Sequence, residues 1–172
     1  MWQKTMDGLH DLINRCLLNH SARIKLIIKR QSECGTMEEF CELPDGKLIL
    51  RTLAMPADTN ANGDIFGGWI MSQMDIAGGI LSKEISGTRT VTIAVESMKF
   101  IRPVKVGDVV SCYGTVERIG TTSITLQLEV WVEPVLRHED TDCPNFKVTE
   151  AAFTYVAIDN QGNKTPIVKR EH

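Results

Sequence analysis

An aspartate inside an apolar stretch is the residue of this sequence whose setting most suggests chemistry. Asp75 lies in WIMSQMDIAGGILSKEIS between Met74 and Ile76, and the residue one helical turn later is Gly79, not a lysine. A solvated carboxylate is the ordinary explanation of a single aspartate on a helix. The apolar neighbours here favour a functional carboxylate, because a general acid, a general base or a nucleophile needs surroundings that change its reactivity.

The segment just upstream, DTNANGDIFGGW at residues 58–69, begins like a calcium-binding loop. Asp58, Asn60 and Asn62 fall where an EF-hand places oxygen ligands. The twelfth position must supply a bidentate glutamate in such a loop, but here it is Trp69. We therefore expect no metal site, and we expect the polar atoms to serve the start of a helix instead.

Two glycines at that helix start predict a site for a carbonyl oxygen. Unpaired N–H groups at a helix N-terminus carry partial positive charge, which stabilises an oxygen that is acquiring negative charge. Gly67 and Gly68 would let a substrate carbonyl approach this backbone directly. Asn62 and Asp64 stand just upstream, where they could cap the helix or hold a water molecule, and the sequence leaves both roles open.

The carboxylate and the helix start are too far apart to act together within one helix. Asp75 follows Gly68 by seven residues, which corresponds to roughly 10 Å along the helix axis. A twofold dimer would remove this difficulty by setting Asp75 of one subunit against the helix start of the other.

The helix expected from residue 68 to about 86 has two distinct faces. The apolar stripe, which can pack on a sheet, holds Ile70, Met74, Ala77, Leu81 and Ile85. The opposite stripe is small or polar and would let a ligand or another backbone come close; it holds Gly68, Ser72, Asp75, Gly79, Ser82 and Ser86.

Strand patterns surround this helix in the sequence. They occupy residues 47–55 before it and residues 90–101, 109–119, 123–134 and 147–159 after it. In the second of these, the apolar phase shifts between Val95 and Met98, which predicts a bulge or a sharp bend. One helix and a run of antiparallel strands predict an α+β fold with the helix packed on a single curved sheet.

Length and composition limit the possible functions. A chain of 172 residues with a net charge of −3 is the size of one ordinary domain and gives no reason to expect nucleic-acid binding. No apolar run approaches the ~20 residues that span a bilayer, so we expect no membrane association. The cysteines are odd in number and lack short metal-binding spacings, which favours a reducing, cytoplasmic setting over a disulfide framework; they are Cys16, Cys34, Cys41, Cys112 and Cys143.

The N-terminal segment differs from the rest of the chain. The first 36 residues hold six Lys or Arg and three acidic residues, so they carry +3 and the remainder carries −6. We expect residues 1–40 to be a dispensable extension and residues 41–172 to form a single domain. Residues 136–146 are the only long polar linker, and we expect them to form a surface loop.

Four segments of the chain resemble the hotdog-fold acyl-CoA thioesterases of the bacterial YciA type. They are TLAMPADTNANGDIFGGWIMSQMDIAGG, VESMKFIRPVKVGDVVSCYG, GTTSITLQLEVWV and TEAAFTYVAID, and the resemblance extends without a break from about residue 47 to 159. It implies a long central helix wrapped by a curved antiparallel sheet of five to six strands. It also implies acyl-CoA as substrate, hydrolysed to fatty acid and coenzyme A without a cofactor or metal, and a homodimer that assembles as a trimer of dimers.

The resemblance also assigns roles to individual residues. The catalytic carboxylate falls on Asp75, and the N–H groups that polarise the thioester carbonyl fall on Gly67 and Gly68 of the partner subunit. Some relatives have asparagine where this chain has Asp64, so its role, in positioning water or holding the loop, stays open. The residues expected to contact substrate are Asn62, Phe66, Trp69, Arg102, Thr121, Thr122 and Ser123. Whether Asp75 attacks the thioester or activates a water is also left open.

Two other functions remain to be compared with hydrolysis. A hotdog dehydratase would need a histidine at the site, and the four histidines lie in the extension, the linker and the tail, at His10, His20, His138 and His172. A non-catalytic acyl-CoA sensor would bind the thioester without releasing a thiol, which makes thiol release the discriminating observation.

Overall fold

The computed structural model describes residues 26–28, 39–135 and 143–167. The chain divides into two compact units, residues 1–43 and 44–172. In the first unit, strand β1 (Leu26–Ile28) pairs antiparallel with β2 (Glu39–Cys41). Most of the extension at 1–40 and most of the expected loop at 136–146 lie outside the described residues, so both expectations stay predictions.

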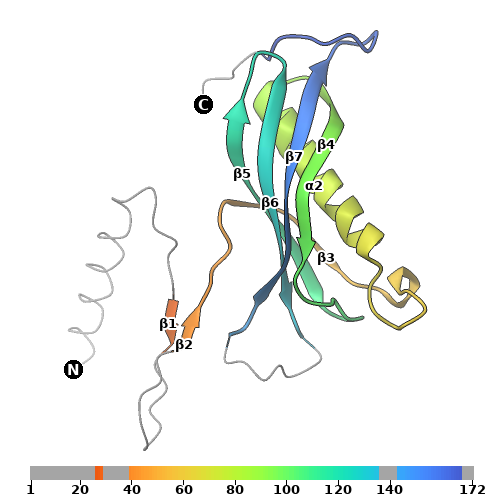
Figure 1. Cartoon of the computed structure of the whole chain (residues 1–172), viewed down its shortest axis with the longest axis vertical. Coiled ribbons are helices and arrows are strands. Elements are labelled where there is room, and N and C mark those ends of the chain that lie inside the picture. The colour runs from red at the N-terminus through yellow and green to blue at the C-terminus, as the bar shows by residue number, and fades with distance from the viewer. Residues whose placement is uncertain (1–25, 29–38, 136–142, 168–172) are drawn as a thin grey trace, which may run out of the picture. The chain divides into compact units, whose positions relative to one another are not determined.

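A five-stranded antiparallel sheet and one long helix make up the described part of the second unit (Figure 1). The strand order is β3-β5-β6-β7-β4. The bounds are β3 (Lys47–Leu53), β4 (Arg89–Phe100), β5 (Val109–Ile119), β6 (Ser123–Glu133) and β7 (Phe146–Ile158). A short 3-10 helix, η1 (Pro56–Asp58), leads toward helix α2 (Gly67–Ser86). The predicted α+β arrangement, a long helix on one antiparallel sheet, is confirmed.

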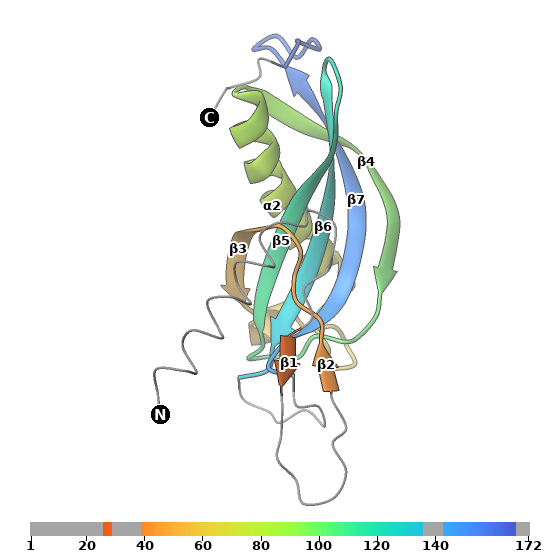
Figure 2. The same ribbon diagram turned by 90° about the vertical axis from the view of Figure 1, so that its left-hand side faces the viewer.

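Helix α2 lies against one face of the curved sheet, and the core fills the space between them (Figure 2). The alternating pattern of β6 turns its apolar residues toward the helix, and all are at most 1% exposed: Ile124, Leu126, Leu128, Val130 and Val132. The apolar stripe of α2 is buried as predicted at Ile70, Met74, Ala77 and Leu81. Burying each large apolar side chain contributes about 1.5–3 kcal/mol, so this contact fixes which face of α2 remains outside.

The small and polar stripe of α2 lets another backbone come close over its last turns, which is one of the two possibilities that the sequence predicts. Ser82 and Ser86 are buried, and the hydroxyl of Ser82 lies 2.8 Å from that of Thr90 on β4. At Gly79, in contrast, an added Cβ would meet no atom within 4 Å. The edge strand β4 of the same chain therefore covers the last turns of the stripe, because the connection from α2 to β4 is only two residues long.

Strand β4 is irregular where the sequence predicts a bulge. Its register with β7 shifts between Thr92 and Ala94 and again between Glu96 and Lys99. Ser97, inside the second shift, has a φ of 56°, a conformation uncommon for a residue with a side chain. The bulge is confirmed, and it lies in β4, which among the described strands pairs only with β7.

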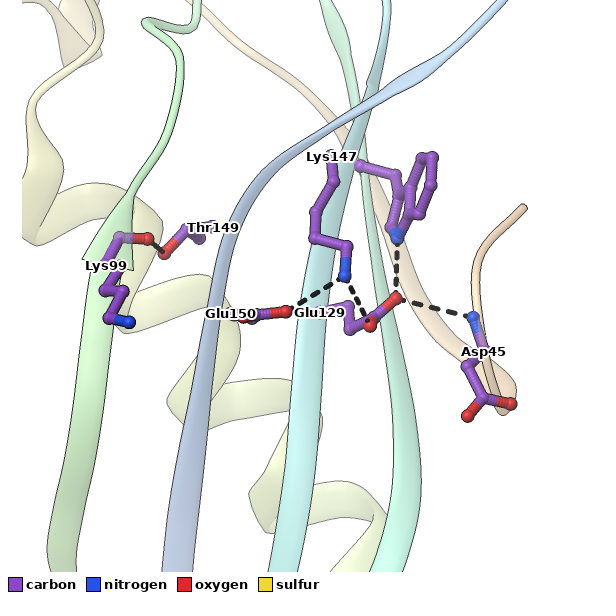
Figure 3. A network of polar contacts seen from close by, with 7 residues as sticks. Asp45, Lys99, Glu129, Lys147, Thr149 and Glu150 are labelled. Atoms are coloured by element: carbon purple, nitrogen blue, oxygen red, sulfur yellow. Dashed lines mark hydrogen bonds and ion pairs between the residues drawn. The ribbon is translucent and has the colours of Figure 1, made fainter. Parts of the chain in front are cut away.

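The face of the sheet turned away from α2 carries a cluster of charges (Figure 3). The Lys147 ammonium lies 2.8 Å from Glu129 Oε1 and 2.9 Å from Glu150 Oε2. Trp131 Nε1–H donates to Glu129 Oε2 at 2.9 Å. Burial lowers the pKa of Lys147, but hydrogen bonds and charge attraction from the two glutamates outweigh it and raise that pKa overall. Glu129 and Glu150 are direct cross-strand neighbours, so Lys147 reduces the repulsion between two carboxylates that face one another.

The cysteines differ from the expectation of unpaired thiols. Cys41 and Cys143 each take part in a disulfide, whereas Cys112 is a buried free thiol. A disulfide requires two Cα atoms within about 7 Å, a proximity that sequence spacing alone does not reveal. Within the described ranges, no helix is long and apolar enough to cross a membrane.

Candidate active site

A pocket of about 340 Å³ opens at the start of α2. Most of its wall is apolar and comes from the first turn of α2, the end of β4 and the start of β7, with Ile70, Phe100 and Val148 as examples. Asp64 and Arg102 are the charged residues that line it. An apolar cleft with a few polar groups at its edge is the usual form of a small-molecule site.

The loop before α2 uses its oxygen atoms to hold its own backbone. The side-chain Oδ1 of Asn60 accepts hydrogen bonds from the N–H of Asn62 at 2.8 Å and of Asp64 at 3.2 Å. The N–H of Phe66 donates to the carbonyl oxygen of Asp58 at 2.8 Å. In the described part of the chain, no three His, Cys, Asp or Glu side chains gather as a metal site would require. The loop therefore fixes the direction in which the chain enters α2.

No described side chain caps the start of α2. Its N-cap residue is Phe66, which has an extended backbone and makes no side-chain capping hydrogen bond. Asn62 and Asp64 therefore do not have the capping role that the sequence left open for them. Gly67 begins the helix on the pocket wall, where an added Cβ would lie 3.3 Å from the ring of Phe100. The positive end of α2 thus faces the pocket.

Asp64 is paired with a cation that the sequence does not single out as its partner. The Lys105 ammonium forms an ion pair with Asp64 Oδ1. The backbone N–H of Lys105 donates to Asp108 Oδ2 at 2.9 Å, which anchors the turn before β5. The ion pair is partly exposed, so it is worth little for stability. Its consequence is local, because it holds the Asp64 carboxylate at the edge of the pocket.

Asp75 lies on the outward side of α2, and two hydroxyl groups hold its carboxylate. Thr92 on β4 donates to Asp75 Oδ1 at 2.5 Å. The hydroxyl of Tyr155 on β7 lies 3.4 Å from the same oxygen and 3.3 Å from the backbone carbonyl oxygen of Asp75. The Asp75 side chain is exposed in the single chain, beside the exposed Ile76. The surrounding residues fix its orientation but do not shield it from water.

Tyr155 is a neutral donor in this arrangement. Burial raises the pKa of its phenol above the usual range, and the charge of Asp75 raises it further. Thr92 and Tyr155 are not among the site residues predicted from the sequence. Both could have been predicted in principle, because each is a polar residue on the side of a strand that faces α2. Which side of β4 faces the helix depends on the position of its bulge, which the sequence does not fix.

The expected substrate-binding residues divide into two groups. Four lie near the start of α2. Arg102 lines the pocket, and its guanidinium lies 4.9 Å above the Phe146 ring. Phe66 is exposed, Trp69 packs partly against the core, and Asn62 lies in the exposed loop. The turn at 121–123 is elsewhere, since Ser123 pairs with Val156 on β7, eight residues along the strand from Val148 of the pocket. That separation is roughly 26 Å at about 3.3 Å per residue. One chain does not bring the two groups together.

Comparison with known proteins places this arrangement in a family. Residues 62–137 match the model described as the thioesterase superfamily. The acyl-CoA thioester hydrolase YciA of Salmonella typhimurium is 59% identical over 124 residues, which cover 72% of this chain and 92% of the relative. The protein of the same name from Escherichia coli is 59% identical over 120 residues, covering 70% of this chain and 89% of the relative.

Solved structures show the same similarity. A hexameric broad specificity acyl-coenzyme A thioesterase has a TM-score of 0.70 and 54% identity, covering 76% of this chain and 86% of that chain. A hexameric thioesterase from Yersinia pestis has a TM-score of 0.68 and 54% identity, covering 74% of this chain and 100% of that chain. With one helix on a five-stranded antiparallel sheet, the chain belongs to the hotdog-fold acyl-CoA thioester hydrolases of the YciA type.

Proposed function

We propose that this protein is an enzyme that hydrolyses acyl-CoA thioesters, with Asp75 as the catalytic carboxylate. The observation that supports this role is that the hydroxyls of Thr92 and Tyr155 contact the Asp75 carboxylate on the outer side of α2. A carboxylate of fixed direction is what attack on a thioester carbonyl requires. The relatives named as acyl-CoA thioester hydrolases support acyl-CoA as the substrate class.

Two chemical routes fit this carboxylate. In one, a carboxylate oxygen of Asp75 attacks the thioester carbon, the coenzyme A thiolate leaves, and water then hydrolyses the mixed anhydride to the free acid. In the other, Asp75 takes a proton from water, the resulting hydroxide attacks the same carbon, and the thiolate leaves and is protonated. In both routes negative charge develops on the carbonyl oxygen, where the N–H groups of Gly67 and Gly68 would stabilise it.

The active unit that we propose is a homodimer, with three dimers forming a hexamer. Asp75 and the start of α2 are roughly 10 Å apart in one chain, so a complete site needs a second chain. One edge of β4 pairs with no other described strand, and this strand exposes Val91, Ile93 and Val95 at 41%, 58% and 39%. Pairing two copies along this edge would cover these side chains and remove water from Asp75. Hexameric relatives support the larger assembly.

A dimer would also join the two groups of substrate-binding residues. Asn62, Phe66, Trp69 and Arg102 would line one part of a shared cleft, and the partner's turn at 121–123 would approach from the other side. Arg102 is suited to a phosphate of coenzyme A, since its guanidinium offers several donors in a fixed plane. Asp64 would position water or hold the loop, with Lys105 keeping its carboxylate in place.

Hydrolysis of short, medium and long acyl-CoA esters, followed with a thiol-reactive dye, tests this proposal. For Asp75→Asn we expect kcat to fall at least about a hundredfold while acyl-CoA still binds, because the variant keeps the shape and loses the charge. Glu84→Gln, which removes an exposed carboxylate from the same helix, should hydrolyse at the wild-type rate. Binding of acyl-CoA by the wild-type protein without any thiol release would instead support the sensor function.

A further inference from the structure

We infer that Tyr155 is a positioning residue for hydrolysis, and that it acts by holding one oxygen of the Asp75 carboxylate from inside the core. This inference rests on the proposed catalytic role of Asp75. It adds a residue from β7, on the side of α2 opposite to the solvent.

The Tyr155 hydroxyl lies against α2 at Gly78 and is close to two oxygen atoms of Asp75. Tyr155 is 1% exposed, and its ring stacks on that of Phe153, with centroids 6.3 Å apart and planes at 15°. A ring packed in this way cannot turn freely, so its oxygen is a fixed point. That point lies 3.3 Å from the backbone carbonyl oxygen of Asp75 and 3.4 Å from Oδ1. The single hydroxyl proton can thus donate to either of two oxygen atoms of Asp75, one on the backbone and one on the side chain.

A glycine in α2 makes this contact possible. A Cβ added at Gly78 would lie 2.1 Å from the Tyr155 oxygen and 2.8 Å from the ring carbon that bears it. Any side chain at position 78 would therefore occupy the space of the hydroxyl. Gly78 weakens the helix intrinsically, by about 1 kcal/mol relative to alanine, and the passage it leaves for Tyr155 gives a reason for a glycine at that place.

The consequence for catalysis concerns the two carboxylate oxygens. Thr92 and Tyr155 both direct their hydroxyls to Oδ1, and among the described residues no hydrogen bond to Oδ2 is formed. Donors near Oδ1 fix the rotation of the carboxylate about its bond to Cβ. Oδ2 therefore points in one direction, toward the place where the thioester or the water would bind. Tyr155 stays protonated through the neutral range, because burial and the charge of Asp75 raise the pKa of its phenol, and it remains a donor throughout.

Removal of this single oxygen is the test, with the other tyrosine of the chain as the matched control. In Tyr155→Phe we expect kcat for acyl-CoA hydrolysis to fall about tenfold with KM within about twofold of wild type, because a lost hydrogen bond to a charged group misorients the carboxylate without removing substrate contacts. Tyr113→Phe, on β5, removes an equivalent hydroxyl and should leave both constants unchanged. An unchanged kcat in Tyr155→Phe would overturn the inference, as would a rise in KM alone.

A double-mutant cycle separates positioning of Asp75 from a general structural effect. In an Asp75→Asn background, Tyr155→Phe should lower the residual rate by less than about twofold, because the group that Tyr155 holds no longer acts. A tenfold loss in both backgrounds would show that the hydroxyl works independently of Asp75, against the inference. Hydrolysis at the wild-type rate by Asp75→Asn alone would refute the proposed function itself, an outcome distinct from a failure of Tyr155→Phe.

Discussion

At the scale of single residues, a carboxylate on a helix surface catalyses little unless its direction is fixed and water is removed around it. In this chain Thr92 and Tyr155 supply the first condition for Asp75. None of the described residues supplies the second, since Asp75 is exposed beside Ile76. The missing shielding is the residue-scale reason to expect a second subunit at the site.

A second residue-scale consequence concerns the buried thiol of Cys112. Burial raises the pKa of Cys112 to about 12, so at pH 8 the thiol stays protonated. We expect no alkylation of Cys112 by iodoacetamide in the native protein, and rapid alkylation once denaturant exposes it. Mass spectrometry of the peptide that contains Cys112 provides the measurement. Modification of Cys112 in the folded protein at the rate of a free thiol would contradict the burial described here.

The sequence predicts Asp75 but not the groups that hold it. Its apolar neighbours are consecutive in the chain, so they are visible without a structure. Thr92 and Tyr155 lie 17 and 80 residues away. Their meeting with Asp75 depends on the register of β4 against β7, which shifts at the bulge. Side chains change faces with every one-residue shift of register, so the position of the bulge decides which hydroxyls reach the helix.

At the scale of elements, the strands and α2 follow their sequence patterns closely, because alternation and helical spacing mark the buried faces directly. The predicted strand at 109–119 has the bounds of β5, and the others differ by one or two residues at one or both ends. The charge cluster on the outer face is different, because Lys147, Glu129 and Glu150 become neighbours only through the pairing of β6 with β7.

This cluster predicts that Lys147 contributes measurably to the stability of the sheet. Lys147→Met removes the cation that pairs with both Glu129 and Glu150, so we expect the free energy of unfolding at pH 7 to fall by about 1–3 kcal/mol. The folded state raises the pKa of Lys147, so it binds this proton more tightly than the unfolded chain does. The stabilisation is therefore complete below about pH 10.4 and is lost as pH rises through the folded-state value.

Urea denaturation of wild type and Lys147→Met at several pH values measures this dependence. The difference between the two proteins should be constant near neutral pH and should narrow above about pH 10.4. Lys47→Met breaks an exposed pair with Glu84, where both side chains are about half exposed, and should cost less than about 1 kcal/mol. Equal losses in the free energy of unfolding for Lys147→Met and Lys47→Met at pH 7 would show that the cluster stabilises the fold no more than an exposed ion pair does.

At the scale of the whole molecule, the proposed site is divided between features that one chain keeps apart. Three features occupy successive positions along the unit: the pocket at the start of α2, Asp75 in the middle of that helix, and the turn at 121–123. The helical rise alone predicts the separation between Asp75 and the helix start, and a twofold dimer would resolve it. The outer edge of β4 is where we expect a second copy to join, because no other described strand pairs with that edge and apolar side chains are exposed there.

Complementation between two inactive variants tests this central claim most directly. Asp75→Asn removes the carboxylate, and Gly67→Val fills the pocket beside the helix start, where even a Cβ would lie 3.3 Å from Phe100. If each site takes Asp75 from one subunit and the helix start from the other, a mixed dimer contains one intact site. Random pairing of the two variants, by co-expression, should then restore roughly a quarter of the wild-type rate of acyl-CoA hydrolysis. Mixed dimers as inactive as either variant alone would contradict the account, since every site would then lie within a single chain.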